Sequence, residues 1–484
     1  MRSTDERGQV LPSICPRFGL AQAGHARRVH SAATGRPIIY SHGGWDPPYT
    51  VGYHSVSANH LQTWMSSEPA TRTRMLSPYR VLDLTDERGL LCGRILADLG
   101  ADVLQIEPPG GSSARRVAPF YRDDPTVDHS LFWWAYAANK RSITLDLARA
   151  DGRALFDRLA ASAHFVIESG RPGELAALGL SYERLAAINP ALIVVSISPF
   201  GQTGPYATYL ASDLVGMGMG GFMYVTGDPD RAPLRVGFPH FYLHGSAAAA
   251  TGAMLAHAQR VSTGQGQHVD VSCQEAVARA LANSLASYAV EGAVIVRQGS
   301  YRQTGANTFM RITWPCKDGF VNFQFSGGAS SGQSVNNFVR WMADEGMPDE
   351  YMLSLDFKSM GYGVITNETM DRIVPPVSRF LMERTKQQLF EGAIERRILL
   401  YPVSTLGDIL DSPQLAARDF FQSFDSPESN DRLTMLGPFA RASAAPLKGG
   451  ALPPKLGEHN AEIYVNELGL DRSELSRLAG SGVI

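Results

Sequence analysis

The chain has 484 residues, a formal net charge of −3 and a hydrophobic content of 44%, which is enough apolar sequence for a large core. At about 100–200 residues per domain, this length predicts two or three domains. The near-neutral charge argues against a nucleic-acid partner. The sequence has no run of about 18 apolar residues, which argues against a membrane span. Four widely spaced cysteines without a CxxC pair are typical of a reducing, cytoplasmic location.

The first 78 residues differ in composition from the rest of the chain. They are rich in Ser, Gly, His, Arg and Thr, and their apolar residues show no sustained period. We predict an irregular extension over residues 1–78 and a folded body that begins near Tyr79. A binding arm, or a segment that the mature protein does not contain, remains an alternative for this extension.

Predicted strands and helices alternate from Tyr79 onward. The strands are predicted at YRVLDLT, ADVLQIE, RSITLDL, AHFVIES and ALIVVSISPFG, and the helices at GLLCGRILADLG, ARADGRALFDRLAAS and LSYERLAAIN. Because a strand–helix–strand unit joins parallel strands, this alternation predicts an α/β fold with an open parallel sheet covered by helices.

A dinucleotide cofactor is one function that such a sheet suggests. Glu107 ends the second predicted strand, where an acid that binds a ribose would lie. However, the turn after the first strand reads DERGLLCG and lacks the GxGxxG pattern that a pyrophosphate needs. Gly89 and Gly93 are therefore better explained by close packing of the helix on the sheet.

Seven segments in order carry a more specific signal. They are CGRILADLGADVLQIEPPGG, NKRSITLDL, PFGQTGPY, STGQGQHVDVS, WPCKDGFV, LDSPQLAARDFF and PPKLGEHN. Together they resemble the family III CoA-transferases (the CaiB/BaiF family), which include formyl-CoA transferase, carnitine CoA-transferase and relatives such as methylacyl-CoA racemase. The resemblance extends from about residue 79 to about residue 470.

The resemblance implies a Rossmann-like large domain with a parallel sheet, a smaller α+β domain and an interlocked-ring dimer. Residues 79–299 would form the N-terminal part of the large CoA-binding domain, and residues 300–430 the small domain. Residues 431–484 would return to the large domain. In the small domain, SGGASSGQS at residues 326–334 is either a mobile loop near the active site or a surface linker.

The family's chemistry requires an aspartate, whose carboxylate attacks the thioester and becomes in turn an anhydride and an enzyme–CoA thioester. In the family this aspartate lies five residues after the glycine of a Val-Gly pair. Here that glycine is Gly237, and the fifth residue beyond it is Tyr242. A phenol has no acyl carbon, so Tyr242 cannot form a thioester with CoA.

Tyr242, His240 and His244 are nevertheless the catalytic candidates. Tyr242 would donate a hydrogen bond to a thioester oxygen, or act as an acid or base beside an imidazolium. The two histidines, four apart, would share a helix face, but they lack a third metal ligand, so no metal is predicted. The alternative is a buried, hydrogen-bonded tyrosine with histidines packed around it.

Other carboxylates near Tyr242 in sequence are weaker candidates. The methylacyl-CoA racemases place a histidine immediately before the aspartate equivalent to Asp213, whereas this chain has Ser212. The racemase interpretation therefore loses its acid/base histidine. Asp228 and Asp230 lie in TGDPDR, which is typical of a turn. A substitute nucleophile among these carboxylates, Glu275 included, would need a different backbone path.

The resemblance also implies CoA contacts in three segments. They are Glu87 and Arg88; Leu145, Asp146 and Ala148; and Ser169, Gly170 and Arg171. Two positions that are basic in formyl-CoA transferase are Pro108 and Ala177 here, which indicates an altered nucleotide site or one that a partner completes. The aromatic cluster Phe132, Trp133, Trp134 and Tyr136 lines an acyl pocket or belongs to the core.

These observations favour an acyl-CoA:carboxylate CoA-transferase that acts as the Asp-lacking subunit of a heteromer with an Asp-containing paralogue. A homodimer is the other assembly. The alternatives in function are a repurposed acyl-CoA lyase, hydratase or racemase-like enzyme that uses Tyr242, and a non-catalytic CoA-binding protein. The expected small molecules are a CoA thioester, as substrate rather than tightly bound cofactor, and a carboxylic acid.

Overall fold

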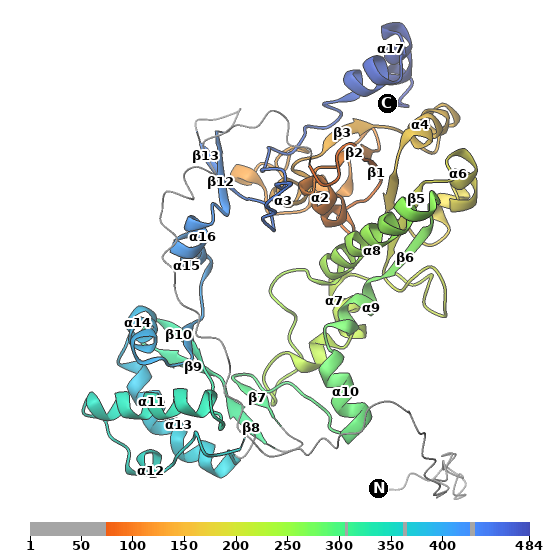
Figure 1. The fold of residues 1–484 in the computed structure, drawn as a ribbon. Helices are drawn as coiled ribbons and strands as arrows, with labels where there is room; N and C mark the ends of the chain where they lie inside the picture. Colours follow the sequence, from red (N-terminus) through yellow and green to blue (C-terminus); the bar gives the residue numbers. More distant parts are fainter. Residues whose placement is uncertain (1–73, 305–307, 362–364, 426–430) are drawn as a thin grey trace, which may run out of the picture. The chain divides into compact units, whose positions relative to one another are not determined.

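The computed structural model describes residues 74–304, 308–361, 365–425 and 431–484 (Figure 1). Almost all of the predicted extension over residues 1–78 therefore lies outside the described residues. Its last part, residues 75–78, forms a turn that leads into the first strand. Within the described ranges, no helix combines the length and the apolar composition needed to cross a membrane.

A sheet of six parallel strands forms the centre of the larger body, in the order β3-β2-β1-β4-β5-β6. The strands are β1 (Arg80–Asp83), β2 (Asp102–Glu107), β3 (Arg141–Thr144), β4 (Phe165–Glu168), β5 (Ile193–Ser198) and β6 (His268–Ser272). The parallel α/β fold predicted from the sequence is confirmed. The strand order reverses between β1 and β4, and parallel sheets bind ligands at the carboxyl ends of the strands beside such a reversal.

Alternating side chains of these strands form two apolar cores, one on each face of the sheet. On one face Val81 and Val103 pack against helices α2 (Leu90–Asp98) and α8 (Phe241–Thr263). On the other face, Leu82 and Leu104 belong to a core built with α4 (Ala150–Ser162), α6 (Tyr182–Ile188), η4 (Glu462–Glu467) and α17 (Arg472–Gly480). Helices on both faces explain why residues 165–167 of β4 and 193–195 of β5 are apolar at consecutive positions.

Shorter helices follow the strand ends of the larger body. They are η1 (Ser113–Arg116), η2 (Tyr121–Asp123), α3 (Leu131–Ala137), α5 (Glu174–Ala177), α7 (Asp213–Met219), η3 (Phe222–Val225), α9 (Cys273–Arg279) and α10 (Ala282–Glu291). Helix α7 packs closely on the start of α8, because a Cβ atom on Gly216 would lie 2.3 Å from the ring of Phe241. The glycines of GMGMGG thus permit this contact.

A second body has its own core, with Trp314, Phe323, Phe338 and Phe380 at its centre. Its strands are β7 (Tyr301–Gln303), β8 (Phe309–Arg311), β9 (Thr313–Cys316), β10 (Gly319–Phe323) and β11 (Leu400–Pro402), and its helices are α11 (Ser331–Asp344), α12 (Glu350–Leu353), α13 (Asn367–Met382) and α14 (Lys386–Arg396). β9, β10 and β11 form an antiparallel sheet, and β7 pairs with β8.

The glycine-rich segment 326–334 is only partly a loop. Residues 331–334 begin helix α11, where a Cβ atom on Gly332 would lie 2.1 Å from the backbone oxygen of Phe357. The prediction of a loop or linker is therefore wrong for residues 331–334, because Gly332 serves close packing there. Residues 326–330 contain neither helix nor strand.

The remaining elements are α15 (Leu406–Leu410), α16 (Pro413–Ala417) and the antiparallel pair β12 (Phe421–Asp425) and β13 (Arg432–Leu436). After them the chain hydrogen-bonds to the large sheet. The Tyr464 hydroxyl donates to the backbone oxygen of Thr144 at 2.8 Å, and the Asp146 amide donates to the oxygen of Val483 at 2.8 Å. The domain boundaries at residues 299 and 430 stay a prediction.

Candidate functional site

The start of helix α8 holds the catalytic candidates, and a carboxylate fixes its position. One oxygen of Asp213 accepts hydrogen bonds from the backbone amides of His240 (2.7 Å) and Phe241 (2.9 Å). The first amides of a helix lack partners within the helix, and an anion there is stabilised by the helix dipole. In this structure Asp213 therefore anchors the segment that carries Tyr242.

The Tyr242 hydroxyl is engaged by the backbone. It donates a hydrogen bond of 2.6 Å to the carbonyl oxygen of Ala211, and the side chain is half-buried. Burial raises the pKa of the phenol well above its usual value. A neutral phenol whose proton is held by a carbonyl agrees with the predicted alternative of a buried, hydrogen-bonded tyrosine.

His240 and His244 lie together at the beginning of α8, as the spacing predicts. Their ring centroids are 5.9 Å apart, and Nδ1 of His244 lies 2.9 Å from the backbone oxygen of His240. Among the described residues, no group of three or more His, Cys, Asp or Glu side chains is arranged to hold a metal ion.

The turn after β1 brings the predicted residues Glu87 and Arg88 toward Tyr242. The Arg88 guanidinium forms a bidentate pair with Asp86, in which Nη2 and Oδ2 are 2.5 Å apart. Ser169, another predicted residue, donates to the same Asp86 carboxylate at 2.9 Å. The Glu87 carboxylate accepts from Ser113 at 2.5 Å. The sequence analysis did not single out Asp86, which joins the turns after β1 and β4.

A cavity of about 420 Å³ opens at the carboxyl ends of the strands, beside the reversal in strand order. It is lined by four of the predicted CoA contacts, Leu145, Asp146, Ala148 and Gly170, and further by Leu84, Ile106, Pro108, Leu147, Glu168, Glu174, Leu175 and Leu178. Of the other predicted contacts, Ser169 is buried next to this wall and the Arg171 side chain is exposed. An apolar cavity with a few polar groups is typical of a ligand site.

Glu168 is a cavity residue that the sequence analysis missed. It ends β4, is 7% exposed, and accepts a hydrogen bond of 2.7 Å from the Gly170 amide. Burial raises the pKa of this carboxyl to about 7. The only sequence signal was an acid at the carboxyl end of the predicted strand AHFVIES.

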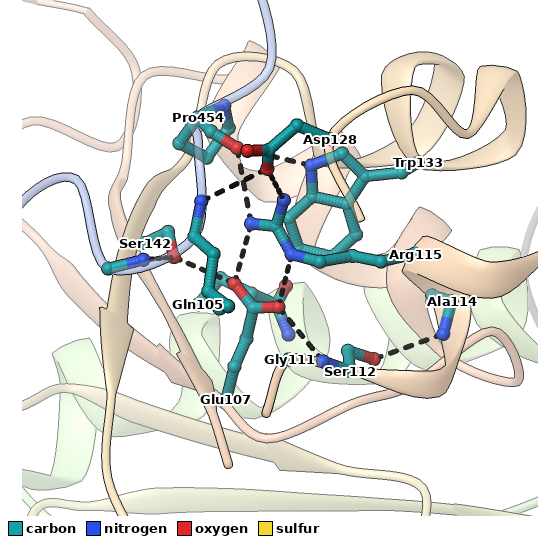
Figure 2. A network of polar contacts seen from close by, with 12 residues as sticks. Gln105, Glu107, Gly111, Ser112, Ala114, Arg115, Asp128, Trp133, Ser142 and Pro454 are labelled. Carbon is teal, nitrogen blue, oxygen red and sulfur yellow. Dashed lines mark hydrogen bonds and ion pairs between the residues drawn. The ribbon is translucent and has the colours of Figure 1, made fainter. Parts of the chain in front are cut away.

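Glu107, the other acid at a strand end, is locked in a buried ion pair. Figure 2 shows its carboxylate against the Arg115 guanidinium, with contacts of 2.6 and 2.9 Å and both side chains fully buried. Ser142 and the Ser112 amide also hydrogen-bond to it. With its oxygens occupied, Glu107 does not fit the role of a ribose-binding acid, which agrees with the missing glycine pattern.

The same network assigns Trp133 to the core. Its ring is fully buried, 3.8 Å from the Arg115 guanidinium carbon, and its indole nitrogen donates to the Pro454 oxygen at 3.2 Å (Figure 2). Trp133 therefore does not line an acyl pocket. The other aromatics of this segment pack against the same cluster and are Phe132, Trp134 and Tyr136.

The sequence signature of CoA-transferase family III matches residues 76–460. The chain belongs to this family. Members of the family use CoA thioesters as substrates, so the predicted transferase class and the acyl-CoA substrate class are confirmed. The match also covers Tyr242 and the cavity.

Relatives and a solved structure agree with the membership. The chain is 36% identical to subunit BbsE of succinyl-CoA:(R)-benzylsuccinate CoA-transferase from Thauera aromatica, over 84% of this chain and 98% of the relative. It is 29% identical to the beta subunit of succinyl-CoA–L-malate CoA-transferase from Chloroflexus aurantiacus, over 86% and 99%. A crystal structure of a CaiB/BaiF family protein from Brucella suis matches with a TM-score of 0.68 and 30% identity, over 82% and 100%.

Proposed function

We propose that this chain is the non-nucleophilic subunit of a heteromeric acyl-CoA:carboxylate CoA-transferase, in which a paralogue supplies the catalytic aspartate. The proposal is carried by Tyr242, which stands where the family resemblance implies the nucleophile. Its hydroxyl is bonded to the Ala211 oxygen. A phenol cannot pass through an anhydride and a thioester, so the covalent steps need another carboxylate.

The carboxylates around Tyr242 have other partners. Asp213 caps α8, Asp86 pairs with Arg88, and Glu87 accepts from Ser113. A carboxylate that neutralises a cation or caps a helix is a weakened nucleophile. These contacts favour a nucleophile from a second chain over a substitute within this one.

Two of the relatives support a heteromer, because the names of both describe them as subunits. Both names also contain succinyl-CoA as the donor, which makes succinyl-CoA the first thioester to test. The cavity lined by Leu145, Asp146, Ala148 and Gly170 supports CoA binding by this chain itself. In the proposed assembly each subunit binds CoA, and only the partner's site completes the covalent chemistry.

The test is mass spectrometry after incubation with succinyl-CoA and hydroxylamine, on this chain alone and on this chain co-expressed with an Asp-containing paralogue. We expect a CoA or hydroxamate mark on an aspartate of the paralogue and none on this chain. A mark on a carboxylate of this chain would refute the proposal. Consumption of the thioester without any mark would instead support proton-transfer chemistry around Tyr242.

Tyr242→Asp provides a gain-of-function test, with Tyr242→Phe as the matched control. If the rest of the site is competent, the aspartate variant acquires a covalent CoA mark that the phenylalanine variant lacks. Absence of the mark in a folded Tyr242→Asp protein that binds CoA would show that more than the nucleophile has been lost.

A further inference from the structure

Three polar side chains link the cavity to the protein surface across adjacent strands. Glu168 ends β4 in the cavity wall, Ser196 lies on β5, and His268 begins β6. The Ser196 hydroxyl is 2.9 Å from Nε2 of His268. Ser196 is also the register partner of Glu168 on the neighbouring strand, so its hydroxyl lies on the same face as the Glu168 carboxyl and favours the carboxylate form. Glu168 is 7% and Ser196 4% exposed, whereas His268 is exposed to solvent. One hydroxyl therefore connects a buried acid to a surface imidazole.

Two arrangements of the protons satisfy the side chains of Glu168, Ser196 and His268. When Glu168 is ionised, Ser196 donates to it and accepts from the Nε2–H of His268. When Glu168 is protonated, it donates to Ser196, which then donates to an unprotonated Nε2. A proton from solvent reaches Glu168 if it binds at Nδ1 of His268 while the Nε2 proton passes to Ser196 and the Ser196 proton passes to the carboxylate.

The imidazole is held in place by Tyr182, whose ring stacks on it with centroids 5.7 Å apart and an interplanar angle of 19°. Tyr182 begins helix α6, so the stacked ring holds the His268 imidazole in one orientation. Histidine suits this position because its ring has two nitrogens, one of which can accept a proton while the other donates one.

Some of the groups around Glu168 favour its neutral form, and others favour its ionised form. Burial and the nearby carboxylate of Glu174 favour the neutral acid, and Asp146 adds a further negative charge to the cavity lining. The Gly170 amide, the Ser196 hydroxyl and the positive charge of Arg88 favour the carboxylate. Burial outweighs the effects that favour the carboxylate and raises the pKa to about 7, so a ligand can shift this buried acid toward its protonated form near neutral pH.

A CoA molecule is such a ligand. Its phosphates bring negative charge toward a cavity whose polar side chains are acids, and its rings exclude water from the cavity. Both effects disfavour a carboxylate. No Lys or Arg is among the described residues that line the cavity, so neutralising an acid achieves part of what an added cation would.

We propose that Glu168 is a CoA-contacting residue that takes up a proton when CoA binds, and that Ser196 and His268 deliver this proton from solvent. The inference rests on the proposed CoA site.

The first test is calorimetric titration of the full chain with CoA near pH 7, in buffers of different ionisation enthalpy. The wild-type chain should take up about half a proton per CoA, because a group with a pKa near the working pH is about half ionised before binding. Glu168→Gln, which is neutral and of the same shape, should bind CoA without proton uptake. Glu368→Gln, at an exposed carboxylate of α13 outside the cavity, is the matched control and should retain the uptake.

Failure of the inference and failure of the CoA site are distinguishable in this experiment. Wild-type binding without proton uptake, or unchanged uptake in Glu168→Gln, would overturn the role of Glu168 and leave the CoA site intact. No binding of CoA by the folded wild-type chain would overturn the site itself.

The route of the proton is tested by stopped flow in weak buffer, with a pH indicator and intrinsic fluorescence recorded together. In the wild-type chain, proton uptake should follow CoA binding at the same rate. Ser196→Ala keeps Glu168 but removes the hydroxyl between Glu168 and His268, so proton uptake by this variant should lag behind CoA binding. Equal rates in Ser196→Ala would exclude the route through Ser196 and His268.

Discussion

The hydroxyl of Tyr242 donates a hydrogen bond of 2.6 Å to the backbone oxygen of Ala211. This bond joins the first turn of α8 to the segment that precedes α7. The residue that the family resemblance places at the nucleophile position thus has a structural partner of its own. Its removal therefore tests stability and catalysis separately.

Tyr242→Phe should lower the free energy of unfolding by about 1 kcal/mol, because the Ala211 oxygen loses its donor. Urea unfolding of the purified chain measures this loss. Transfer by the heteromer should stay within about twofold of wild type. Tyr288→Phe, at an exposed tyrosine of α10, is the control and should change neither quantity. A heteromer inactivated by Tyr242→Phe would show that the phenol takes part in the reaction.

Arg115→Met should be among the most damaging single substitutions in the larger body. It leaves the fully buried carboxylate of Glu107 without its cation, a change that typically costs about 3–5 kcal/mol. Arg115→Met combined with Glu107→Gln should recover part of the loss. Arg184→Ala removes the surface pair with Asp157 and should cost less than about 1 kcal/mol. Similar losses for Arg115→Met and Arg184→Ala in guanidinium unfolding would contradict the assignment.

Gly216→Ala should disturb the start of α8 from the side of α7. The added Cβ would lie 2.3 Å from the Phe241 ring, so the ring or the helix must move, at a cost of about 1–3 kcal/mol. Gly237→Ala is the matched control, because no atom lies within 4 Å of the equivalent position. Thermal unfolding compares the two variants, and equal midpoints would argue against the close packing of α7 on α8.

Two histidines that are held neutral should contribute a loss of stability on mild acidification. Nδ1 of His164 accepts from the Arg80 amide at 3.0 Å, and Nδ1 of His257 accepts from Arg260 at 2.8 Å. Burial, followed by the charge of Arg260, lowers the pKa of both histidines.

The sign of the pH dependence follows from these lowered pKa values. Above the ordinary histidine pKa of about 6.5, both histidines are neutral in the folded and in the unfolded chain, and their full contribution to stability is present. Below it only the unfolded chain takes up protons, so stability is lost as the pH falls toward the lowered pKa of the folded state. The raised pKa of Glu168 acts in the opposite direction over the same pH range, because the folded chain then takes up this proton before the unfolded chain does. The test therefore compares urea unfolding of the wild type and His257→Gln at a series of pH values, and His257→Gln should lose less stability on acidification. A slope unchanged in His257→Gln would remove that residue from the explanation.

The strands could be predicted from sequence because their signal is local. YRVLDLT and AHFVIES carry runs of apolar residues, and the structure places β1 and β4 within them. The cavity residues Leu145 and Gly170 followed from the family resemblance rather than from any pattern of their own. A family resemblance assigns roles to positions in the sequence, and here it pointed to residues that are distant in sequence and line one wall of the cavity.

The partners of buried polar groups could not be predicted. Arg115 pairs with Glu107 eight residues earlier, yet it also donates to the Pro454 oxygen, 339 residues away. Ser196 and His268 are 72 residues apart and meet only because β5 and β6 are neighbours. An acid at a strand end looks the same in sequence whether an arginine neutralises it or a cavity isolates it, so Glu107 was considered and Glu168 was missed.

The hydrogen bond from Asp146 to Val483 has a consequence for the order in which the protein is made. Asp146 lines the cavity, and its amide is held by the backbone oxygen of Val483. A nascent chain cannot complete this wall until Val483 has been synthesised and has left the ribosome. Chains that stop before Val483 therefore cannot form the intact wall.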